Sequence, residues 1–282
     1  MLRQRIATAA VLLALLLAVL WAPGQWPFAA FSLAVFCAAG WEWGRLNHPD
    51  GIVPIALGAA VAVLCLAAAG AGWTARPPAW LWWLALAGWV AGGAWAIRHG
   101  PSGWGRQPAW LRQGLGVLLL GLGWLAIVHA HALGLNFLLS VACLVWTADI
   151  AAYFGGRAFG RRKLAPAISP GKSWAGVWSG MIGVLVLGAV WWLVIDRYVA
   201  VDGPSVYTRL AARLGGAGGA LSLVFLAAMS VVGDLVESLV KRSAGAKDSS
   251  SLLPGHGGVL DRIDALLPVF PLALALAVSA SA

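Results

Sequence analysis

The sequence has very little charge. Only 10% of its 282 residues are Asp, Glu, Lys or Arg, and 61% are hydrophobic, whereas a soluble domain has about 25% charged and about 45–50% apolar residues. This composition excludes an ordinary water-soluble domain. The basic start before the first apolar run leaves a cleaved signal peptide as an alternative for that segment, but further apolar runs follow and no convincing small-residue cleavage site is present.

Cysteine is also scarce. The three cysteines, Cys37, Cys65 and Cys143, each lie inside an apolar run, where a thiol behaves as a small buried hydrophobe. We therefore predict neither a disulfide framework nor a metal site built from thiolates.

Long apolar runs, in contrast, occupy most of the chain. A helix needs roughly 20 apolar residues to cross a bilayer core of about 30 Å, and such runs lie near 6–21, 27–44, 52–72, 79–97, 113–132, 135–155, 174–195, 218–240 and 260–280. They are continuously apolar and do not alternate as lipid-facing strands do. The sequence predicts an all-α, polytopic integral membrane protein with about nine transmembrane helices.

The basic residues are distributed asymmetrically about these runs. With the N-terminus in the cytoplasm, all but four of the 19 lysines and arginines fall on the cytoplasmic side, the exceptions being Arg76, Arg197, Arg209 and Arg213. This bias predicts that topology. The net charge of +9 then lies in short loops beside the membrane, which favours anionic lipids and small anionic substrates as partners rather than nucleic acid.

Charge divides the chain into two parts of one integral domain. Residues 1–110 are nearly featureless and are interpreted as scaffold helices, while residues 111–282 carry the charged motifs and are predicted to hold a site that faces the cytoplasm. In the first part, Glu42 lies three residues before Arg45 in "WEWGRL". We interpret it as a member of an ion pair at a helix end and not as a catalytic group.

Asp149 lies inside the apolar run "NFLLSVACLVWTADIAAYFGG". A carboxylate at such a position costs about 2.5–3.5 kcal/mol and usually faces a polar cavity. Tyr153 follows at i+4 and is expected to share its helix face. A structural carboxylate near the membrane interface is the alternative.

The segment "SVVGDLVESLVKR" carries a stripe of polar side chains. Asp234, Glu237, Ser238 and Lys241 follow one another at i, i+3, i+4 and i+7, so they lie on one side of a helix. Such a stripe needs an aqueous pocket or partners. An exposed Glu237–Lys241 pair is the modest alternative.

Asp261 and Asp264 open the last apolar run in "LDRID". Acidic residues there also suit a helix N-terminus, but the loop that separates them from Asp234 is short. Asp234 and Asp261 are therefore expected within reach of one ion. Because neither cysteine nor clustered histidine accompanies them, the predicted ion is a hard cation, Mg²⁺.

Phosphate-binding residue types surround these carboxylates. Lys241, Arg242, Lys247 and Arg262 can contact phosphate oxygens, and glycines such as Gly257 and Gly258 let backbone amides approach them. Lys172 and Ser173 repeat the pattern where the next helix begins, and helix N-termini favour anions. The sum is a pocket for a metal and a polyphosphate, suggesting that a nucleotide meets a membrane-bound substrate. His256 fits a base, a phosphate donor or a loop stabiliser equally well.

The segment "SLVKRSAGAKDSSSLLPGHGGVLDRID", Ser238 to Asp264, resembles along its whole length the signature of the phosphatidate cytidylyltransferases. The segments "ADIAAYFGGRAFG" and "LAPAISPGKSWAG" resemble a second conserved region of that family. The resemblance implies transfer of cytidylyl from CTP to phosphatidic acid. It also implies a multi-helix homodimer of the bacterial inner membrane that depends on Mg²⁺, with K⁺ as a possible second ion.

The resemblance also implies roles for individual residues. It makes Asp234, Asp261 and Asp149 the metal site, and Lys241, Arg242, Lys247, His256 and Arg262 the catalytic residues along the phosphate path. The substrate-binding set is Lys172, Ser173, Ser238, Asp248, Gly257 and Gly258. The chain departs from the family pattern at Gly171 and Ala175, where Lys and Glu are more usual, so no essential role is expected at position 175.

Three other functions fit parts of the pattern. An ion-coupled transporter also uses intramembrane carboxylates, but here the charges crowd one membrane face. A CDP-alcohol phosphotransferase would need a spaced acidic pattern that is missing from the sequence. A CTP-dependent lipid kinase would share the nucleotide and would form CDP in place of pyrophosphate.

Overall fold

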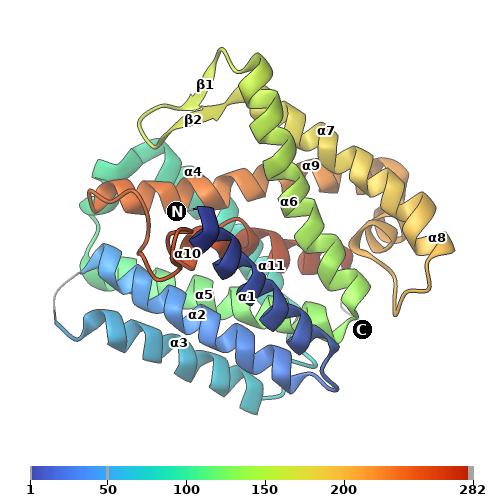
Figure 1. Cartoon of the computed structure of the whole chain (residues 1–282), viewed down its shortest axis with the longest axis horizontal. Coiled ribbons are helices and arrows are strands. Elements are labelled where there is room, and N and C mark those ends of the chain that lie inside the picture. The colour runs from blue at the N-terminus through green and yellow to red at the C-terminus, as the bar shows by residue number, and fades with distance from the viewer. Residues whose placement is uncertain (1, 49–50, 279–282) are drawn as a thin grey trace.

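The computed structural model describes residues 2–48 and 51–278, and it is built almost entirely from helices. The first five are α1 (Leu2–Trp21), α2 (Trp26–Asn47), α3 (Val53–Gly70), α4 (Trp80–Gly105) and α5 (Ala109–Ala132). They are followed by α6 (Leu135–Phe159), α7 (Trp174–Val190), the π-helical turn η1 (Trp191–Ile195), α8 (Asp196–Tyr198), α9 (Val206–Ser243), α10 (Leu260–Ile263) and α11 (Leu266–Ala277). Figure 1 shows the helices gathered into one bundle.

The predicted apolar runs all fall on helices, which confirms a polytopic all-α membrane protein. Within the described residues, six helices are long and apolar enough to cross a membrane: α3, α4, α5, α6, the continuous segment Trp174–Tyr198, and α9. The apolar part of α1 is shorter, Thr8–Trp21, and α2 and α11 are not among the six. The number of nine crossings therefore stays a prediction, and residues 279–280 of the last predicted run lie outside the described residues.

A small β-hairpin, which the sequence did not predict, joins α6 to α7. Strand β1 (Lys163–Ala165) pairs antiparallel with β2 (Ser169–Ser173), and Lys163 lies opposite Ser173. Ile168 in its turn is 3% exposed, and its carbonyl accepts a hydrogen bond of 3.4 Å from Arg242 Nε at the end of α9. The hairpin, at the top of Figure 1, is thereby held over the end of α9.

Helix α9 is bent at Gly215, whose φ of +71° lies in the left-handed region. Side chains disfavour that region, so glycine is the residue that permits the bend. The part of α9 after the bend coincides with the predicted run at 218–240. It carries the whole polar stripe from Asp234 to Lys241.

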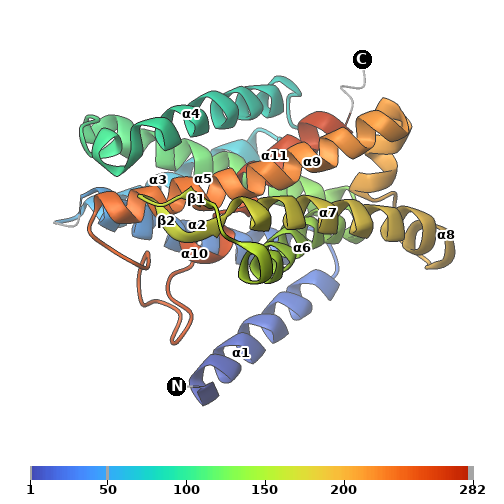
Figure 2. The same cartoon turned by 90° about the horizontal axis from the view of Figure 1, so that it is seen from above.

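Helix α11 lies in the middle of the bundle, as Figures 1 and 2 show. It packs against α9, α5 and α4, and most of its residues are buried, with Val269, Leu272, Ala273 and Leu274 fully enclosed. Its 12 residues make a helix of about 18 Å. Its burial and its packing against three other helices make α11 the apolar centre of the protein.

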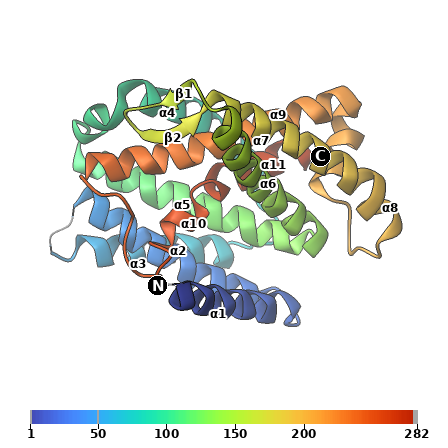
Figure 3. The same ribbon diagram turned by 45° about the horizontal axis from the view of Figure 1, so that its top comes forward.

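The loop of residues 244–259 connects α9 to α10. Figure 3 shows it reaching across α2 toward the start of α1 before it returns to the bundle. Thr8 Oγ1 donates a hydrogen bond of 3.1 Å to the carbonyl of Pro254 at the far point of this loop. The loop carries much of the segment that the sequence marked as functional.

Candidate active site

A cavity of about 790 Å³ lies between α6, the hairpin, α7, α9 and α10. Six of the predicted site residues line it: Asp149, Lys172, Ser173, Asp234, Asp261 and Arg262. Other polar side chains on its walls are Tyr153, Arg157, Lys163, Ser169 and Asp264. Acidic and basic groups from distant parts of the chain thus face one space.

Asp149 and Tyr153 line this cavity from α6, which confirms that they share a helix face. Arg157, one turn further, donates a hydrogen bond of 3.2 Å from Nη1 to Tyr153 Oη. The three side chains line one wall of the cavity, in which the guanidinium is hydrogen-bonded to the phenol.

Asp234 already has a cation beside it. Lys172 Nζ, from strand β2, lies 2.7 Å from Asp234 Oδ2, and both side chains are partly exposed. Ser238 Oγ, predicted to bind substrate, donates to Asp234 Oδ1 at 3.2 Å. Ser173 Oγ accepts from Gly176 N–H at 3.2 Å and caps α7. Its hydroxyl therefore helps to fix the cavity wall from which the side chain of Lys172 extends.

Lys241 lies between two carboxylates. Its Nζ is 2.7 Å from Glu237 Oε2 and 2.6 Å from Asp261 Oδ1, and the lysine side chain is 12% exposed. The Glu237–Lys241 pair therefore exists, but it is not the exposed pair that the sequence allowed as an alternative. It is a largely buried cluster that also includes α10.

Asp261 accepts hydrogen bonds from the loop as well as from Lys241. Its Oδ2 accepts hydrogen bonds from Ser249 N–H (3.1 Å) and Gly258 N–H (2.8 Å), and it lies 3.0 Å from the hydroxyl oxygen of Ser249. Helix α10 lies outside the six spanning helices. Burial would raise the pKa of Asp261, but the hydrogen bonds and the charge of Lys241 outweigh it and lower the pKa to about 2. The carboxylate is thus a permanent anion at neutral pH.

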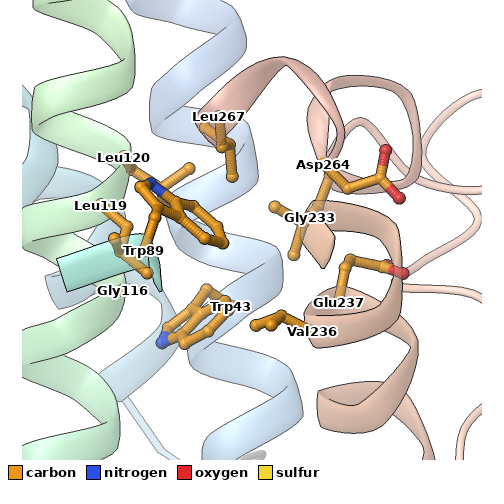
Figure 4. A pocket seen from close by; sticks show the side chains of 11 residues that line it. Trp43, Trp89, Gly116, Leu119, Leu120, Gly233, Val236, Glu237, Asp264 and Leu267 are labelled. Atoms are coloured by element: carbon orange, nitrogen blue, oxygen red, sulfur yellow. The ribbon is translucent and has the colours of Figure 1, made fainter. Parts of the chain in front are cut away.

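Asp264, just after α10, faces the same cavity. Its burial and the nearby negative charge of Asp234 raise its pKa. Figure 4 shows the carboxylates of Glu237 and Asp264 directed away from the indoles of Trp43 and Trp89. The space between these groups is only about 10 Å³, so the tryptophans close the apolar side of the site.

The carboxylates suit a hard cation in their chemistry. Within residues 2–48 and 51–278, no group of three or more His, Cys, Asp or Glu side chains is arranged to hold a metal ion. Mg²⁺, however, is usually bound by one or two carboxylates together with substrate phosphates. Asp234 and Asp264, whose charges repel each other, fit that pattern in their chemistry. The predicted metal site of Asp234, Asp261 and Asp149 stays a prediction.

The remaining predicted residues do not line the cavity. Arg242 donates to the carbonyls of Ile168 and Ala246 and so ties the hairpin to the loop. Lys247 and Asp248 are exposed on the loop. The backbone carbonyl of His256 accepts from Arg262 Nε at 3.1 Å, and that of Gly257 accepts from Leu253 N–H at 2.9 Å. Both bonds stabilise the loop, and the predicted roles of the His256 imidazole stay predictions.

The ion pair predicted between Glu42 and Arg45 is wrong. Glu42 forms no salt bridge with Arg45 in the part of the chain that the structure describes; Arg45 instead lies over the ring of Trp41, 4.9 Å from its centroid. Glu42 is fully buried and accepts hydrogen bonds from Ser249, Ser250, Val259 and Leu260. These partners are more than 200 positions away, and no local pattern could have indicated them.

Comparison with known proteins agrees with this geometry. The model of the family described as "Cytidylyltransferase family" matches residues 3–280. A phosphatidate cytidylyltransferase of Pseudomonas aeruginosa is 40% identical over 98% of this chain and 97% of its own length. Relatives of the same name from Haemophilus influenzae and Bacillus subtilis are 49% and 38% identical, each over 49% of this chain and over 44% and 46% of their own lengths. The chain belongs to the cytidylyltransferase family.

Proposed function

We propose that this protein transfers the cytidylyl group of CTP to phosphatidic acid, giving CDP-diacylglycerol and pyrophosphate for phospholipid synthesis. The observation that carries the proposal is the cavity of about 790 Å³ in a membrane protein, whose walls combine carboxylates with Lys and Arg side chains. The names of the relatives, above all the one matched over nearly its whole length, support the same substrates.

The reaction joins two anions, and the residues of the cavity suit that task. A phosphate oxygen of phosphatidic acid attacks the α-phosphorus of CTP, the bond to the β-phosphate breaks, and pyrophosphate leaves. Lys172, Arg157, Lys163 and Arg262 line the space and would neutralise the phosphates as charge moves onto the leaving group. The lipid phosphate is already ionised near neutral pH, so no general base is required.

Lys172 and Lys241 differ in what they can offer a substrate. Lys172 is paired with Asp234 alone and is partly exposed, so an incoming phosphate can compete for it. Lys241 is held between Glu237 and Asp261, and it acts on the site by fixing those carboxylates.

Mg²⁺ is the proposed cofactor. Asp234 and the carboxylates around α10, Asp261 and Asp264, with Asp149 beside them, would hold it, and K⁺ remains a proposed second ion. Such an ion would polarise the phosphoryl group and offset the charge of the pyrophosphate.

The proposed setting is the bacterial inner membrane. About nine crossings with the N-terminus in the cytoplasm would place the cavity at the cytoplasmic surface, where CTP is present. The positive-inside bias of the sequence supports this orientation. A homodimer is proposed from the family resemblance, and residues 111–282 would carry the catalytic region.

The decisive experiment supplies the purified protein in detergent with CTP labelled at its α-phosphorus, phosphatidic acid and Mg²⁺. We expect label in a CDP-lipid and release of one pyrophosphate per lipid, with both lost when EDTA removes the metal. Release of CDP together with a phosphorylated lipid would assign a kinase, and unconsumed CTP would refute the proposal.

A further inference from the structure

The carboxylate of Glu42 joins α2 to the middle of the 244–259 loop and to the junction of this loop with α10. Its Oε1 accepts from Ser250 Oγ at 2.5 Å and from Val259 N–H at 2.9 Å. Its Oε2 accepts from Ser249 Oγ at 3.0 Å and from Leu260 N–H at 2.6 Å. Each oxygen therefore receives one hydroxyl and one backbone amide, and all four donors belong to residues 249–260.

The environment of Glu42 leaves no room for another partner. The side chain is 0% exposed, and it forms no salt bridge with any residue that the structure describes. A side chain on Gly258 would begin 2.6 Å and 2.8 Å from the two oxygens of Glu42. Burying a carboxylate is unfavourable unless it is hydrogen-bonded, and hydrogen bonds to charged groups contribute about 1.5–3 kcal/mol each. The four bonds thus hold the loop at one defined place.

Ser249 connects this anchor to the cavity. Its Oγ lies 3.0 Å from Glu42 Oε2 and also 3.0 Å from Asp261 Oδ2, and its N–H donates to Asp261 Oδ2 at 3.1 Å. Asp261 lines the cavity, whereas Glu42 and Ser249 do not. A change in the hydrogen bonds of Glu42 is therefore transmitted to Asp261 through one residue.

We propose that Glu42 is a positioning residue for the reaction. It fixes the 244–259 loop and, through Ser249, the orientation of Asp261, without touching substrate. The kinetic consequence rests on the proposed function, whereas the fixing of the loop does not. Helix α2, predicted as scaffold, would thereby share in catalysis.

The variant Glu42→Gln tests this proposal with little change in side-chain volume. The amide NH₂ would replace one oxygen and face the N–H of Val259 or Leu260, so that a donor meets a donor. We expect kcat to fall at least about tenfold with KM for CTP within about twofold of wild type, because an oriented group is disturbed and no substrate contact is lost.

Limited proteolysis gives a readout that needs no activity. Lys247 is exposed on the loop, and trypsin cleaves after lysine. In Glu42→Gln we expect cleavage after Lys247 to be at least about tenfold faster than in wild type, while the melting temperature of the bundle changes little.

Two further variants complete the design. Arg45→Ala, on the same helix, removes a guanidinium that lies over the ring of Trp41 and should match wild type in both assays. Ser249→Ala should resemble Glu42→Gln, and the double variant should fall no further than Glu42→Gln alone, since both remove the same connection.

The outcomes separate this inference from the proposed function. Wild-type kcat together with wild-type proteolysis in Glu42→Gln overturns it, and so does a loss of activity accompanied by general unfolding or by additive losses in the double variant. If wild type itself does not convert CTP, the proposed function fails, and accelerated cleavage at Lys247 alone still supports the anchoring role.

Discussion

The two ends of the bundle both contain several carboxylates, but they use them differently. At the α8 end, Asp196 accepts hydrogen bonds from Asn136 Nδ2 at 2.8 Å, Ser205 Oγ at 2.5 Å and Thr208 Oγ1. Asp202 accepts from the N–H groups of Leu135 and Asn136 at the start of α6. Neutral donors fill these carboxylates, and the cavity of about 790 Å³ does not reach them.

At the α10 end, the carboxylates meet cations and a cavity. Asp234 pairs with Lys172, and Asp261 pairs with Lys241, while Asp149 and Asp264 face the same space. A carboxylate filled by neutral donors stabilises a fold, whereas a partly exposed carboxylate that is paired with a lysine beside a cavity can release that lysine to a phosphate and take up a metal ion in its place. The difference lies in the partners of the acids and not in their number.

The largest effect is expected for Asp234→Asn. The substitution removes one negative charge from the cavity and takes the ionic partner from Lys172, with little change of side-chain size. Turnover should therefore fall by at least about 10²-fold. The fold should persist, because Asp234 is partly exposed. Cytidylyl transfer and circular dichroism of the purified variant measure the two quantities, and substantial remaining turnover would remove Asp234 from the site.

Asp261→Asn should also abolish most turnover and, in addition, loosen the protein. Lys241 would lose one of its two carboxylates, and the amide would face the N–H of Gly258 or Ser249 with its own donor. We expect a loss of about 2–4 kcal/mol in the free energy of unfolding beside the loss of activity. A variant with normal activity would place Asp261 outside the reaction.

Lys241→Ala should have a smaller effect on chemistry. Removing the ammonium leaves Glu237 and Asp261 without their cation, so lowered stability and a kcat about tenfold lower are expected, with little change in KM for CTP because Lys241 does not line the cavity. Steady-state kinetics at varied CTP check this result. An unchanged rate and an unchanged melting temperature would mean that the Glu237–Lys241 pair contributes as little to stability as an exposed ion pair does.

The smallest effect on turnover is expected at the other end of the bundle. In Asp196→Asn, the new amide NH₂ faces either the hydroxyls of Ser205 and Thr208, which both donate to Oδ2, or Asn136 Nδ2, which donates to Oδ1. At least one donor then loses its acceptor, at a cost of about 1–3 kcal/mol, while kcat stays at the wild-type value. Thermal melting and the cytidylyl assay on one preparation measure both. A fall in kcat without a fall in stability would break the distinction between the two ends.

Much of this arrangement could be predicted from local patterns. A membrane-spanning helix must be long and apolar, so its position follows from composition alone. The helical period placed Asp234 and Lys241 on one side of α9, and it placed Asp149 and Tyr153 on one wall of the cavity. Each of these predictions needed only a few neighbouring residues.

Contacts between distant segments could not be predicted in this way. Nothing near Glu42 indicates that its partners lie at 249–260, and the familiar spacing to Arg45 suggested a contact that the fold does not make. The hairpin was missed because its strands are short and because its residues Lys172 and Ser173 were interpreted as the start of the next helix. Arg242 was expected to bind phosphate, yet it contacts backbone carbonyls that the hairpin brings to it.

The central position of α11 has a consequence for how the protein is made. Helices α4, α5 and α9 precede α11 in the chain, so the ribosome synthesises the helices that surround α11 before it synthesises α11 itself. Until α11 arrives, these helices must either pack on one another or enclose lipid. We expect the polar loop and α10, which directly precede α11, to take their final places only when it enters, so that the reactive site is assembled at the last step of folding.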